Sequence, residues 1–524
     1  MLGWNNACVL VMSVVLVAIT PTTHASCEST TPGLTKFYSE TWGIDFRGQR
    51  FQPAANTTIN AANASSLTLK WAYGLGDNQP RSLPLVTEDT IFFGDGSRGL
   101  VALDRATGCV RWENLQIGDI ATAIVHEEVD GRDLLFFSGR LSGVHAVDAA
   151  TGEAVWNAAV EENPIPMYSG SLIAYRDKVF VPLSSMEIAL TINPFYGCCT
   201  TSGGMAALDS ATGELVWYLP TVDEEPSVSG RHWLFVEEWG PSGAPVWGSP
   251  MLDVQRGLLF YGSGQNYSRP ASLTSDAIFA VDIATGKPKW IQQFTAGDAY
   301  NLACEIPGHP NCPKPMGPDV DFGAPPILVT SRSGDDLILA GQKSGDIYAL
   351  NPDNGESVWS TRIGRGSALG GVHWGMAVNP ELGLLFVPIS DRDAHPGEGQ
   401  AAPGMHALDY TTGELEWSVV RKTQCEACEP GLSAAITAGP GIVVAGGLDG
   451  RLEIYNATNG DRLWAYDTAV DFTAVNGIPT RGGGFDAHGP MLADDLLIVA
   501  SGYESFGQIP GNALLVFEVS GDVR

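Results

Sequence analysis

Basic residues are scarce in this sequence. Among its 524 residues, 29 are Lys or Arg and 59 are Asp or Glu, which gives a formal net charge of −30 at pH 7. Nucleic acids and anionic membrane surfaces attract basic proteins, so neither is an expected partner. The acidic surface that this composition predicts favours solubility, and it is compatible with a cationic protein partner.

Long hydrophobic runs are also scarce. Residues 8–19 form one extended apolar run, which is too short to cross a bilayer comfortably. Small residues at Thr23 and Ala25 then mark a cleavage position. We therefore expect residues 1–26 to be a signal peptide and residues 27–524 to be a periplasmic or secreted protein without a transmembrane segment. A lipid anchor on Cys27 is the alternative.

Motifs for covalent haem and for nucleotides are absent. Cys425-Glu-Ala-Cys428 is followed by Glu429 instead of the His that haem attachment requires, and no P-loop or dinucleotide fingerprint stands between a strand and a helix. Of the 9 Cys, Cys8 would leave with the signal peptide, and the even number that remains predicts disulfides in an exported protein. Plausible pairs are Cys27–Cys109, Cys304–Cys312 and Cys425–Cys428.

One phrase recurs along the chain and predicts the fold. A run ending in Ala-Leu-Asp or a close variant is followed by Ala-Thr-Gly or a variant of it and then by a Trp. The first run alternates apolar and polar residues like a strand, and the Gly supplies the positive φ of a tight turn. The second strand carries a Trp that can pack on the neighbouring sheet. These Trp residues are Trp112, Trp156, Trp217, Trp290, Trp359, Trp417 and Trp464, and a Gly precedes each by four residues.

Further short apolar runs lie between the copies, which makes about four strands per repeat, or one propeller blade. An eighth blade needs both ends of the chain, because residues 67–71 and residues 514–519 each provide half of the phrase. We therefore expect an all-β protein, a single eight-bladed β-propeller closed by pairing of N- and C-terminal strands. Its long insertions, around residues 160–205, 220–275 and 295–335, are where function is expected.

This repeat resembles that of the quinoprotein alcohol dehydrogenases, which oxidise alcohols with pyrroloquinoline quinone (PQQ) and calcium. The segments 42–45 and 50–53 are similar to the opening of that family, and the segments 180–209, 318–323 and 471–489 resemble its polyvinyl-alcohol dehydrogenase branch. The resemblance implies hydride transfer from an alcohol, possibly secondary or polymeric, to PQQ, and electron delivery to an external carrier such as cytochrome c. The alternative is a non-catalytic propeller that acts as a binding or assembly scaffold in the cell envelope, since such scaffolds share the blade.

The resemblance also implies a base and a metal site. Asp321 matches the catalytic aspartate of the family, so its expected role is to take the hydroxyl proton of the alcohol. Asp319 is the alternative base. Glu187 matches a calcium ligand of the family, and Gln265 stands where methanol dehydrogenase has an Asn ligand, so both are expected to bind Ca²⁺ together with Asp321. Asn266 is the alternative to Gln265. Calcium is favoured over a lanthanide because residue 323 is Gly and not the additional Asp of lanthanide-dependent relatives.

The remaining expected contacts are with the cofactor. Trp247 precedes Gln265 at the family spacing, which implies the aromatic floor under PQQ, and Lys343 matches the cation beside the reactive quinone oxygen. Cys198 and Cys199 are adjacent, and a disulfide ring of this kind covers PQQ in methanol dehydrogenase. Two separate bridges or two buried thiols are the alternatives. Other expected cofactor contacts are Ser169 and Ser184, Arg81 in place of a Glu, and His373 in place of an Asn.

Overall fold

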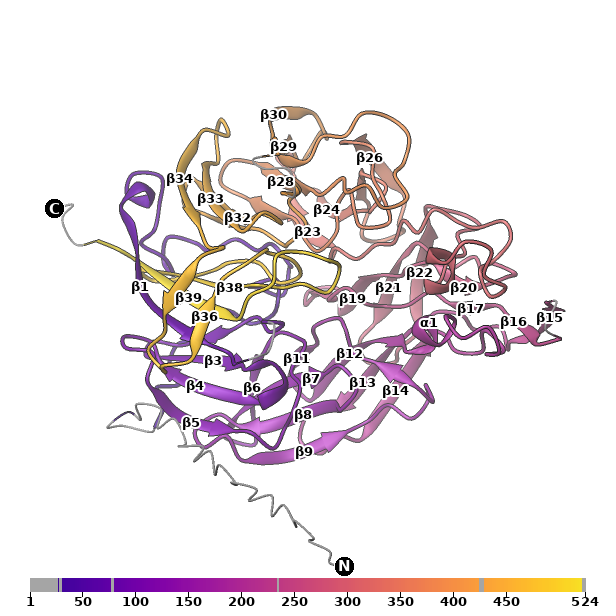
Figure 1. The fold of residues 1–524 in the computed structure, drawn as a ribbon, viewed down its shortest axis with the longest axis horizontal. Helices are drawn as coiled ribbons and strands as arrows, with labels where there is room; N and C mark the ends of the chain where they lie inside the picture. Colours follow the sequence, from indigo (N-terminus) through magenta and orange to yellow (C-terminus); the bar gives the residue numbers. More distant parts are fainter. Residues whose placement is uncertain (1–26, 28–30, 77–79, 233–234, 424–427, 521–524) are drawn as a thin grey trace, which may run out of the picture.

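The computed structural model describes residues 27, 31–76, 80–232, 235–423, 428–520. The predicted signal peptide, residues 1–26, lies outside them. The described residues form eight antiparallel sheets of four or more strands, arranged around a ring (Figure 1). In seven blades the strands pair in chain order, in the eighth the first strand of the chain pairs with the last, and the first strands of several neighbouring blades contact one another. The expected eight-bladed, all-β propeller is confirmed.

The first four blades contain these strands. Blade 1 has β2 (Leu85–Val86), β3 (Thr90–Gly94), β4 (Leu100–Asp104) and β5 (Val110–Asn114). Blade 2 has β6 (Val125–Val129), β7 (Arg132–Gly139), β8 (Gly143–Asp148) and β9 (Ala154–Ala158). Blade 3 has β11 (Ile173–Tyr175), β12 (Lys178–Ser185), β13 (Gly204–Asp209) and β14 (Leu215–Pro220), with β10 (Pro166–Met167) also paired to β12. Blade 4 has β18 (Met251–Asp253), β19 (Leu258–Gly262), β21 (Ala277–Asp282) and β22 (Pro288–Gln293).

The other four complete the ring. Blade 5 has β23 (Ile327–Thr330), β24 (Asp336–Gly341), β25 (Asp346–Leu350) and β26 (Ser357–Arg362). Blade 6 has β27 (Ala377–Asn379), β28 (Leu384–Ile389), β29 (Gly404–Asp409) and β30 (Leu415–Val420). Blade 7 has β31 (Thr437–Gly439), β32 (Ile442–Gly446), β33 (Arg451–Asn456) and β34 (Arg462–Asp467). Blade 8 has β37 (Met491–Ala493), β38 (Leu496–Ser501), β39 (Ala513–Val519) and β1 (Leu67–Gly74).

The repeated phrase locks each blade to the next. In blade 2, Asp148 accepts hydrogen bonds from the turn, and Gly152 adopts a φ of 74°. A Cβ on Gly152 would lie 2.5 Å from the ring of Trp112 in blade 1, so only Gly lets that Trp pack there. Trp156 reaches the other way and donates to the carbonyl of Ser210 in blade 3. The phrase therefore recurs along the chain because every blade makes the same contact with its neighbour.

The ring closes through the two ends of the chain, as expected. β1 pairs antiparallel with β39, and Trp71 lies opposite Val516. Trp71 packs against Gly108 of blade 1, which repeats the contact made between the other blades. On the opposite side, Trp464 of blade 7 donates to the carbonyl of Leu67. Blade 8 thus belongs to the ring by the same contacts as the seven continuous blades.

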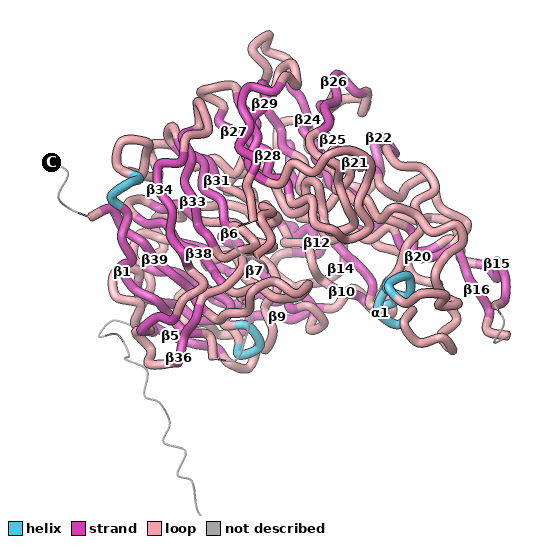
Figure 2. Tube along the Cα trace, turned by 45° about the horizontal axis from the view of Figure 1, so that its top comes forward, coloured by secondary structure: helices cyan, strands magenta, loops and turns pink. Residues whose placement is uncertain are grey.

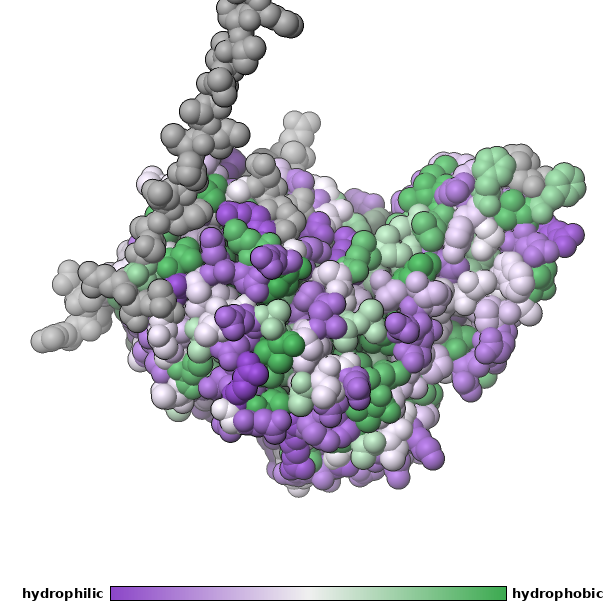
Figure 3. Space-filling view, turned by 90° about the horizontal axis from the view of Figure 1, so that it is seen from below, coloured by the Kyte–Doolittle hydropathy of each residue, from purple (hydrophilic) through white to green (hydrophobic). Residues whose placement is uncertain are grey.

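The insertion elements α1 (Glu187–Leu190), β15 (Ser227–Arg231), β16 (Glu237–Gly240) and β20 (Asn266–Ser268) gather at one edge of the ring, and β36 (Pro479–Arg481) lies at the opposite edge (Figure 2). Outside the blades, the described residues form three two-stranded sheets, one helix and three 3₁₀ turns. Polar and apolar side chains alternate over the side of the surface shown in Figure 3. No helix among the residues described is long and apolar enough to span a membrane. The elements are η1 (Ala64–Ser66), η2 (Gly96–Arg98), α1 (Glu187–Leu190), β15 (Ser227–Arg231), β16 (Glu237–Gly240), β17 (Ser242–Gly243), β20 (Asn266–Ser268), η3 (Leu302–Glu305), β35 (Asp471–Thr473) and β36 (Pro479–Arg481).

Disulfides tie down three of these peripheral segments. Cys27 pairs with Cys109, Cys304 pairs with Cys312, and the neighbours Cys198 and Cys199 pair with each other. The first two confirm expected pairs, and the third confirms the ring form over separate bridges or free thiols. Cys428 is disulfide-bonded, and Cys425, its expected partner, lies outside the described residues.

Candidate active site

Asp321 is the centre of the buried polar cluster in the propeller. It lies in the loop before β23, is 3% exposed and accepts three hydrogen bonds. The backbone N–H of Gln265 donates to Oδ1 at 2.8 Å, and Trp247 Nε1 and Lys343 Nζ donate to Oδ2 at 2.8 and 3.0 Å. Four residues that the sequence analysis selected from separate segments therefore meet at one carboxylate.

Lys343 carries the positive charge of this cluster. It is 5% exposed, and its Nζ also lies 3.1 Å from Asp319 Oδ1 and 5.5 Å from the centre of the Trp247 ring. Burial lowers the pKa of Lys343, but attraction to Asp319 and Asp321 outweighs it, so the pKa is raised and the side chain stays charged. Asp319, the alternative base, is thus engaged mainly as the second partner of Lys343.

The arrangement distinguishes Gln265 from Asn266. The side-chain amide of Asn266 forms hydrogen bonds with Ser242 and Ser272. The Gln265 amide instead faces Asp321, and with its nitrogen turned inward it donates to Oδ1 at 2.7 Å. With its oxygen turned inward, two acceptor oxygens would face each other and would need a cation between them. Amide and carboxylate oxygens are the ligands that Ca²⁺ prefers, so this pair fits such an ion.

Glu187 is buried and its carboxylate is already fully engaged. Both oxygens accept from the backbone N–H groups of Thr200 and Thr201 at 2.7–2.9 Å, and the Thr201 hydroxyl and the Tyr196 hydroxyl add bonds at 2.6 and 2.8 Å. A carboxylate has about four lone-pair positions, so these donors saturate it. In this structure Glu187 anchors the segment that follows Cys198–Cys199, and the described residues contain no group of three or more His, Cys, Asp or Glu arranged to hold a metal.

The Cys198–Cys199 disulfide is a junction between insertions. Its backbone pairs with β16, since Cys199 N–H donates to Trp239 O and Trp239 N–H donates to Cys198 O. Cys198 Sγ lies 4.0 Å from Asn301 Nδ2, and Asn301 caps the 3₁₀ turn η3. Three insertions thus converge on this disulfide, which is buried. None of its contacts is with Asp321, Lys343 or Trp247.

Trp247 lies directly over the backbone of Gly323. A Cβ on residue 323 would fall 1.8 Å from Trp247 Cη2, so the ring and any larger residue exclude each other. Trp374 and His373 meet the Trp247 ring edge-on, at centroid distances of 5.1 and 5.6 Å. Trp374 was missed in the sequence, although it is a Trp outside the repeated phrase.

The other predicted cofactor contacts lie around this Trp. Ser169 lines a small cavity together with Trp247 and His488, and Ser184 Oγ donates to the carbonyl of Val246. Arg81 is half-buried, and its backbone hydrogen-bonds His488. All three therefore lie near the Trp247 side of the ring.

Two further acids were missed by sequence reasoning. Asp298 accepts from the backbone N–H groups of Asp319 and Val320 at 3.2 and 3.0 Å, so it holds the loop that presents Asp321. Asp276 is fully buried, and neither carboxylate oxygen has a hydrogen-bond partner among the described residues. Burial and the negative charges of Asp298 and Asp321 raise the pKa of Asp276 well above its usual range. The region thus holds four acids and one buried cation, and the raised pKa of Asp276 favours the neutral form of that carboxyl.

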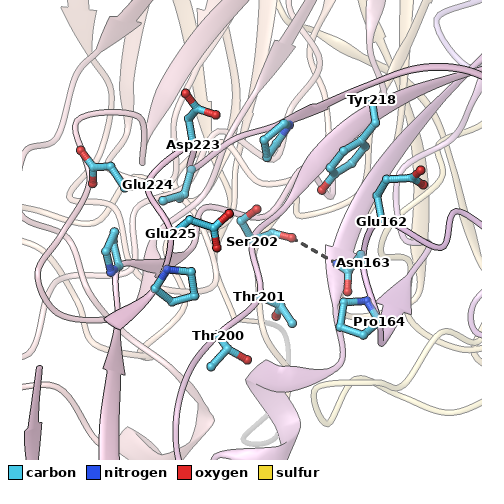
Figure 4. Close-up of a pocket in the computed structure, with 14 residues that line it drawn as sticks. Glu162, Asn163, Pro164, Thr200, Thr201, Ser202, Tyr218, Asp223, Glu224 and Glu225 are labelled. Carbon is cyan, nitrogen blue, oxygen red and sulfur yellow. Dashed lines mark hydrogen bonds between the residues drawn. The ribbon is translucent and has the colours of Figure 1, made fainter. Parts of the chain in front are cut away.

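A larger pocket lies beside the Cys198–Cys199 segment (Figure 4). It has a volume of about 220 Å³ and an acidic rim, and Asn163 donates to the carbonyl of Ser202 across it. Thr200 and Thr201, which hold Glu187, form part of its wall. None of the residues around Asp321 lines it. The acids on its rim are Glu162, Asp223, Glu224 and Glu225.

Comparisons with known proteins agree with this geometry. A family model described as the beta-propeller domain of glucose/ethanol/alcohol dehydrogenase matches residues 189–311, the part that contains Trp247 and Gln265. A polyvinylalcohol dehydrogenase from Pseudomonas sp. is 35% identical over 503 residues, which cover 92% of this chain and 76% of that protein. The chain belongs to the PQQ-dependent alcohol dehydrogenase family. It is by this membership an oxidoreductase, and the family implies PQQ as its cofactor.

More distant relatives share the fold. A quinohemoprotein alcohol dehydrogenase from Comamonas testosteroni is 24% identical over 525 residues, covering 83% of this chain and 70% of that protein. Its crystal structure superposes with a TM-score of 0.68 at 19% identity, over 94% of this chain and 82% of that chain. A model described as outer membrane protein assembly factor BamB matches residues 55–237 and 274–510, which places the blades in that repeat family too. That match omits the segment with Trp247 and Gln265.

Proposed function

We propose that this protein oxidises alcohols, including secondary and polymeric ones, with PQQ and Ca²⁺, and passes the electrons to an external carrier such as a cytochrome c. The observation that carries the proposal is the convergence of Trp247, Gln265 and Lys343 on Asp321. Polymeric substrates are supported by the name of a relative that shares 35% of its residues. The net charge of −30 supports a basic carrier.

The side chains have distinct roles in this proposal. Asp321 takes the hydroxyl proton of the alcohol as the general base, and the three hydrogen bonds that it accepts hold its carboxylate in position. Lys343 holds a fixed positive charge beside it and stabilises negative charge that develops in the site. Trp247 provides a flat apolar surface. When bound, PQQ would supply the hydride acceptor, and Ca²⁺ would supply a Lewis acid beside the cofactor.

Gln265 and Asp321 would hold the metal. Glu187 would reach it only after releasing Thr200 and Thr201, so we assign it first to anchoring the Cys198–Cys199 segment. Calcium binding is therefore expected to change the environment of that segment if Glu187 is a ligand, and to leave it unchanged if Glu187 is only an anchor. The Cys198–Cys199 disulfide ring would lie over the cofactor. The edges of the cofactor would contact Ser169, Ser184, Arg81 and His373.

We also propose export to the periplasm or beyond. The three disulfides among the described residues support an oxidising compartment. In this reading residues 1–26 are removed, and residues 27–524 form one propeller. Purification of the protein from the periplasm and sequencing of its mature N-terminus would test both statements.

Dye-linked oxidation by the purified protein tests the enzymatic proposal, with primary, secondary and polymeric alcohols and with PQQ and Ca²⁺ added together or singly. Activity should need both additions and fall by about 10²–10⁴-fold in Asp321→Ala, since a general base contributes that much. Asp319→Asn should keep more activity than Asp321→Ala, and equal losses would not support Asp321 as the base.

A scaffold function is the second candidate, because the BamB model matches most of the blades. It predicts no PQQ binding at all. Titration of PQQ into the protein with Ca²⁺ present, followed by quenching of tryptophan fluorescence with Trp247→Phe as control, distinguishes the two functions. Absence of binding would leave the scaffold as the better account.

A further inference from the structure

A buried chain of hydrogen bonds leads away from Trp247 through three successive blades. His373 Nδ1 lies 2.7 Å from Ser433 Oγ, and Ser433 Oγ donates to Asp486 Oδ1 at 2.7 Å. The exposed fractions are 4% for His373, 0% for Ser433 and 5% for Asp486. Each residue stands just before the innermost strand of its blade, β27, β31 or β37, so all three line the ring axis.

Asp486 ends the chain as an acceptor. Besides Ser433, its Oδ1 accepts from the backbone N–H of Ala487 at 2.9 Å, and its Oδ2 accepts from the Gln508 amide. Burial raises the pKa of Asp486, and the three hydrogen bonds that its carboxylate accepts act against that rise by stabilising the ionised form. The single hydrogen of the Ser433 hydroxyl is therefore committed to Asp486.

This commitment fixes the state of the histidine. Since Ser433 Oγ has given its hydrogen to Asp486, it must accept one from His373, so Nδ1 carries a proton. Burial, with the charges of Lys343 and Arg392, lowers the pKa of His373 well below its usual value, and the ring is neutral. A neutral ring with a proton on Nδ1 has a bare lone pair on Nε2. The ring itself packs edge-on against Trp247.

We infer that Ser433 and Asp486 hold His373 with Nε2 as a proton acceptor, and that it is the second acceptor of the site beside Asp321. This inference rests on the proposed function. Oxidation of an alcohol to a carbonyl releases two electrons and two protons. Asp321 takes the hydroxyl proton, and the second proton leaves the site when the electrons pass to the external carrier.

The second proton then moves along the chain of hydrogen bonds. His373 Nε2 accepts it, Nδ1–H passes its proton to Ser433 Oγ, and the Ser433 hydroxyl proton moves to Asp486 Oδ1. The His373 ring remains neutral throughout, and one proton has left the site for Asp486. An Asn at position 373, the residue expected from the relatives, could not accept a proton in this way.

The state of His373 can be read without cofactor or substrate. In ligand-free protein labelled with ¹⁵N-histidine, His373→Asn identifies the signal, and we expect Nδ1 protonated and Nε2 bare from pH 5 to pH 9. Ser433→Ala and Asp486→Asn should each shift the signal toward the Nε2-protonated form. Ser390→Ala is the matched control, because the Ser390 hydroxyl is buried without a hydrogen-bond partner among the residues described, and it should leave the signal unchanged.

Kinetics test the second half of the inference. In Ser433→Ala, single-turnover oxidation of the alcohol should stay within about twofold, while steady-state turnover falls by about 10²-fold. Asp486→Asn should show the same split with a smaller loss. A protonated Nε2 in the native protein, or equal losses in both kinetic phases, overturns the inference. An inactive native protein would refute the proposed function and leave the ¹⁵N result to decide the state of His373.

Discussion

Removing the positive charge from Lys343 should destabilise the ligand-free protein measurably. Its Nζ lies 3.0 Å from Asp321 and 3.1 Å from Asp319, and at an effective dielectric constant of about 20 each attraction is about 5 kcal/mol before desolvation is subtracted. Lys343→Met keeps the bulk of the chain but leaves two buried carboxylates without a cation. Removing one partner of a buried ion pair costs about 3–5 kcal/mol.

Calorimetry of the ligand-free variants measures this cost. Unfolding entropy is about 2.1 cal/mol/K per residue, so for about 500 residues a loss of 3–5 kcal/mol lowers the melting temperature by about 3–5 °C. Lys289→Met is the matched control, because Lys289 is exposed on β22, and it should melt within about 0.5 °C of the native protein.

A second variant links the loss to the ion pair. Adding Asp319→Asn to Lys343→Met removes one of the two uncompensated charges and should recover part of the lost stability. The reasoning is refuted if Lys343→Met melts like Lys289→Met, or if the double variant is no more stable than the single one.

Three further variants test separate features. Gly323→Ala places a methyl group where Trp247 Cη2 lies, so we expect a loss of about 1–3 kcal/mol in urea unfolding and altered tryptophan fluorescence, and unchanged fluorescence would contradict the contact. In Glu187→Gln the amides of Thr200 and Thr201 should exchange hydrogen faster, measured by mass spectrometry, while exchange in the distant β38 stays the same. Burial raises the pKa of Asp95 from 3.8 to about 6, so ionisation of Asp95 lowers the stability of the fold as pH rises from about 4 through 6. The free energy of unfolding of Asp95→Asn should match that of the native protein near pH 4 and exceed it by up to about 3 kcal/mol at pH 7.5. A difference that does not depend on pH would argue against this origin.

Local repetition explains why the fold could be predicted. The Asp, Gly and Trp of each copy interact within one hairpin or with the next blade. Each copy therefore predicts the same hairpin wherever it occurs in the sequence. The eighth blade could be predicted because each end of the chain has half of the phrase: β1 has the Trp without the turn, and β39 lacks the Trp. The meeting of Trp247, Gln265, Asp321 and Lys343 could be expected from the resemblance, since each matched a family position in chain order.

Other features depend on how insertions fold back, which the sequence does not reveal. Glu187 was expected to bind Ca²⁺, and no local pattern in the sequence shows that the backbone N–H groups of Thr200 and Thr201 donate to its oxygens. Asp298 precedes a long insertion, and its role appears only when that insertion returns to place Val320 beside it. The contact between His373 and Asp486 joins residues in different blades, and no local pattern links them.

The pairing of β1 with β39 also sets the order in which the molecule can be completed. Lys70 and Glu518 form an ion pair across 448 positions of sequence, so the first strand of the propeller must wait unpaired while every other blade is synthesised. Until residues 513–519 emerge, β38 has an open edge and Trp71 has no strand beside it. Unpaired edges recruit other chains. The interval before the last strand arrives is therefore when this protein is most exposed to aggregation, and a chaperone that covers one sheet edge would be enough to protect it.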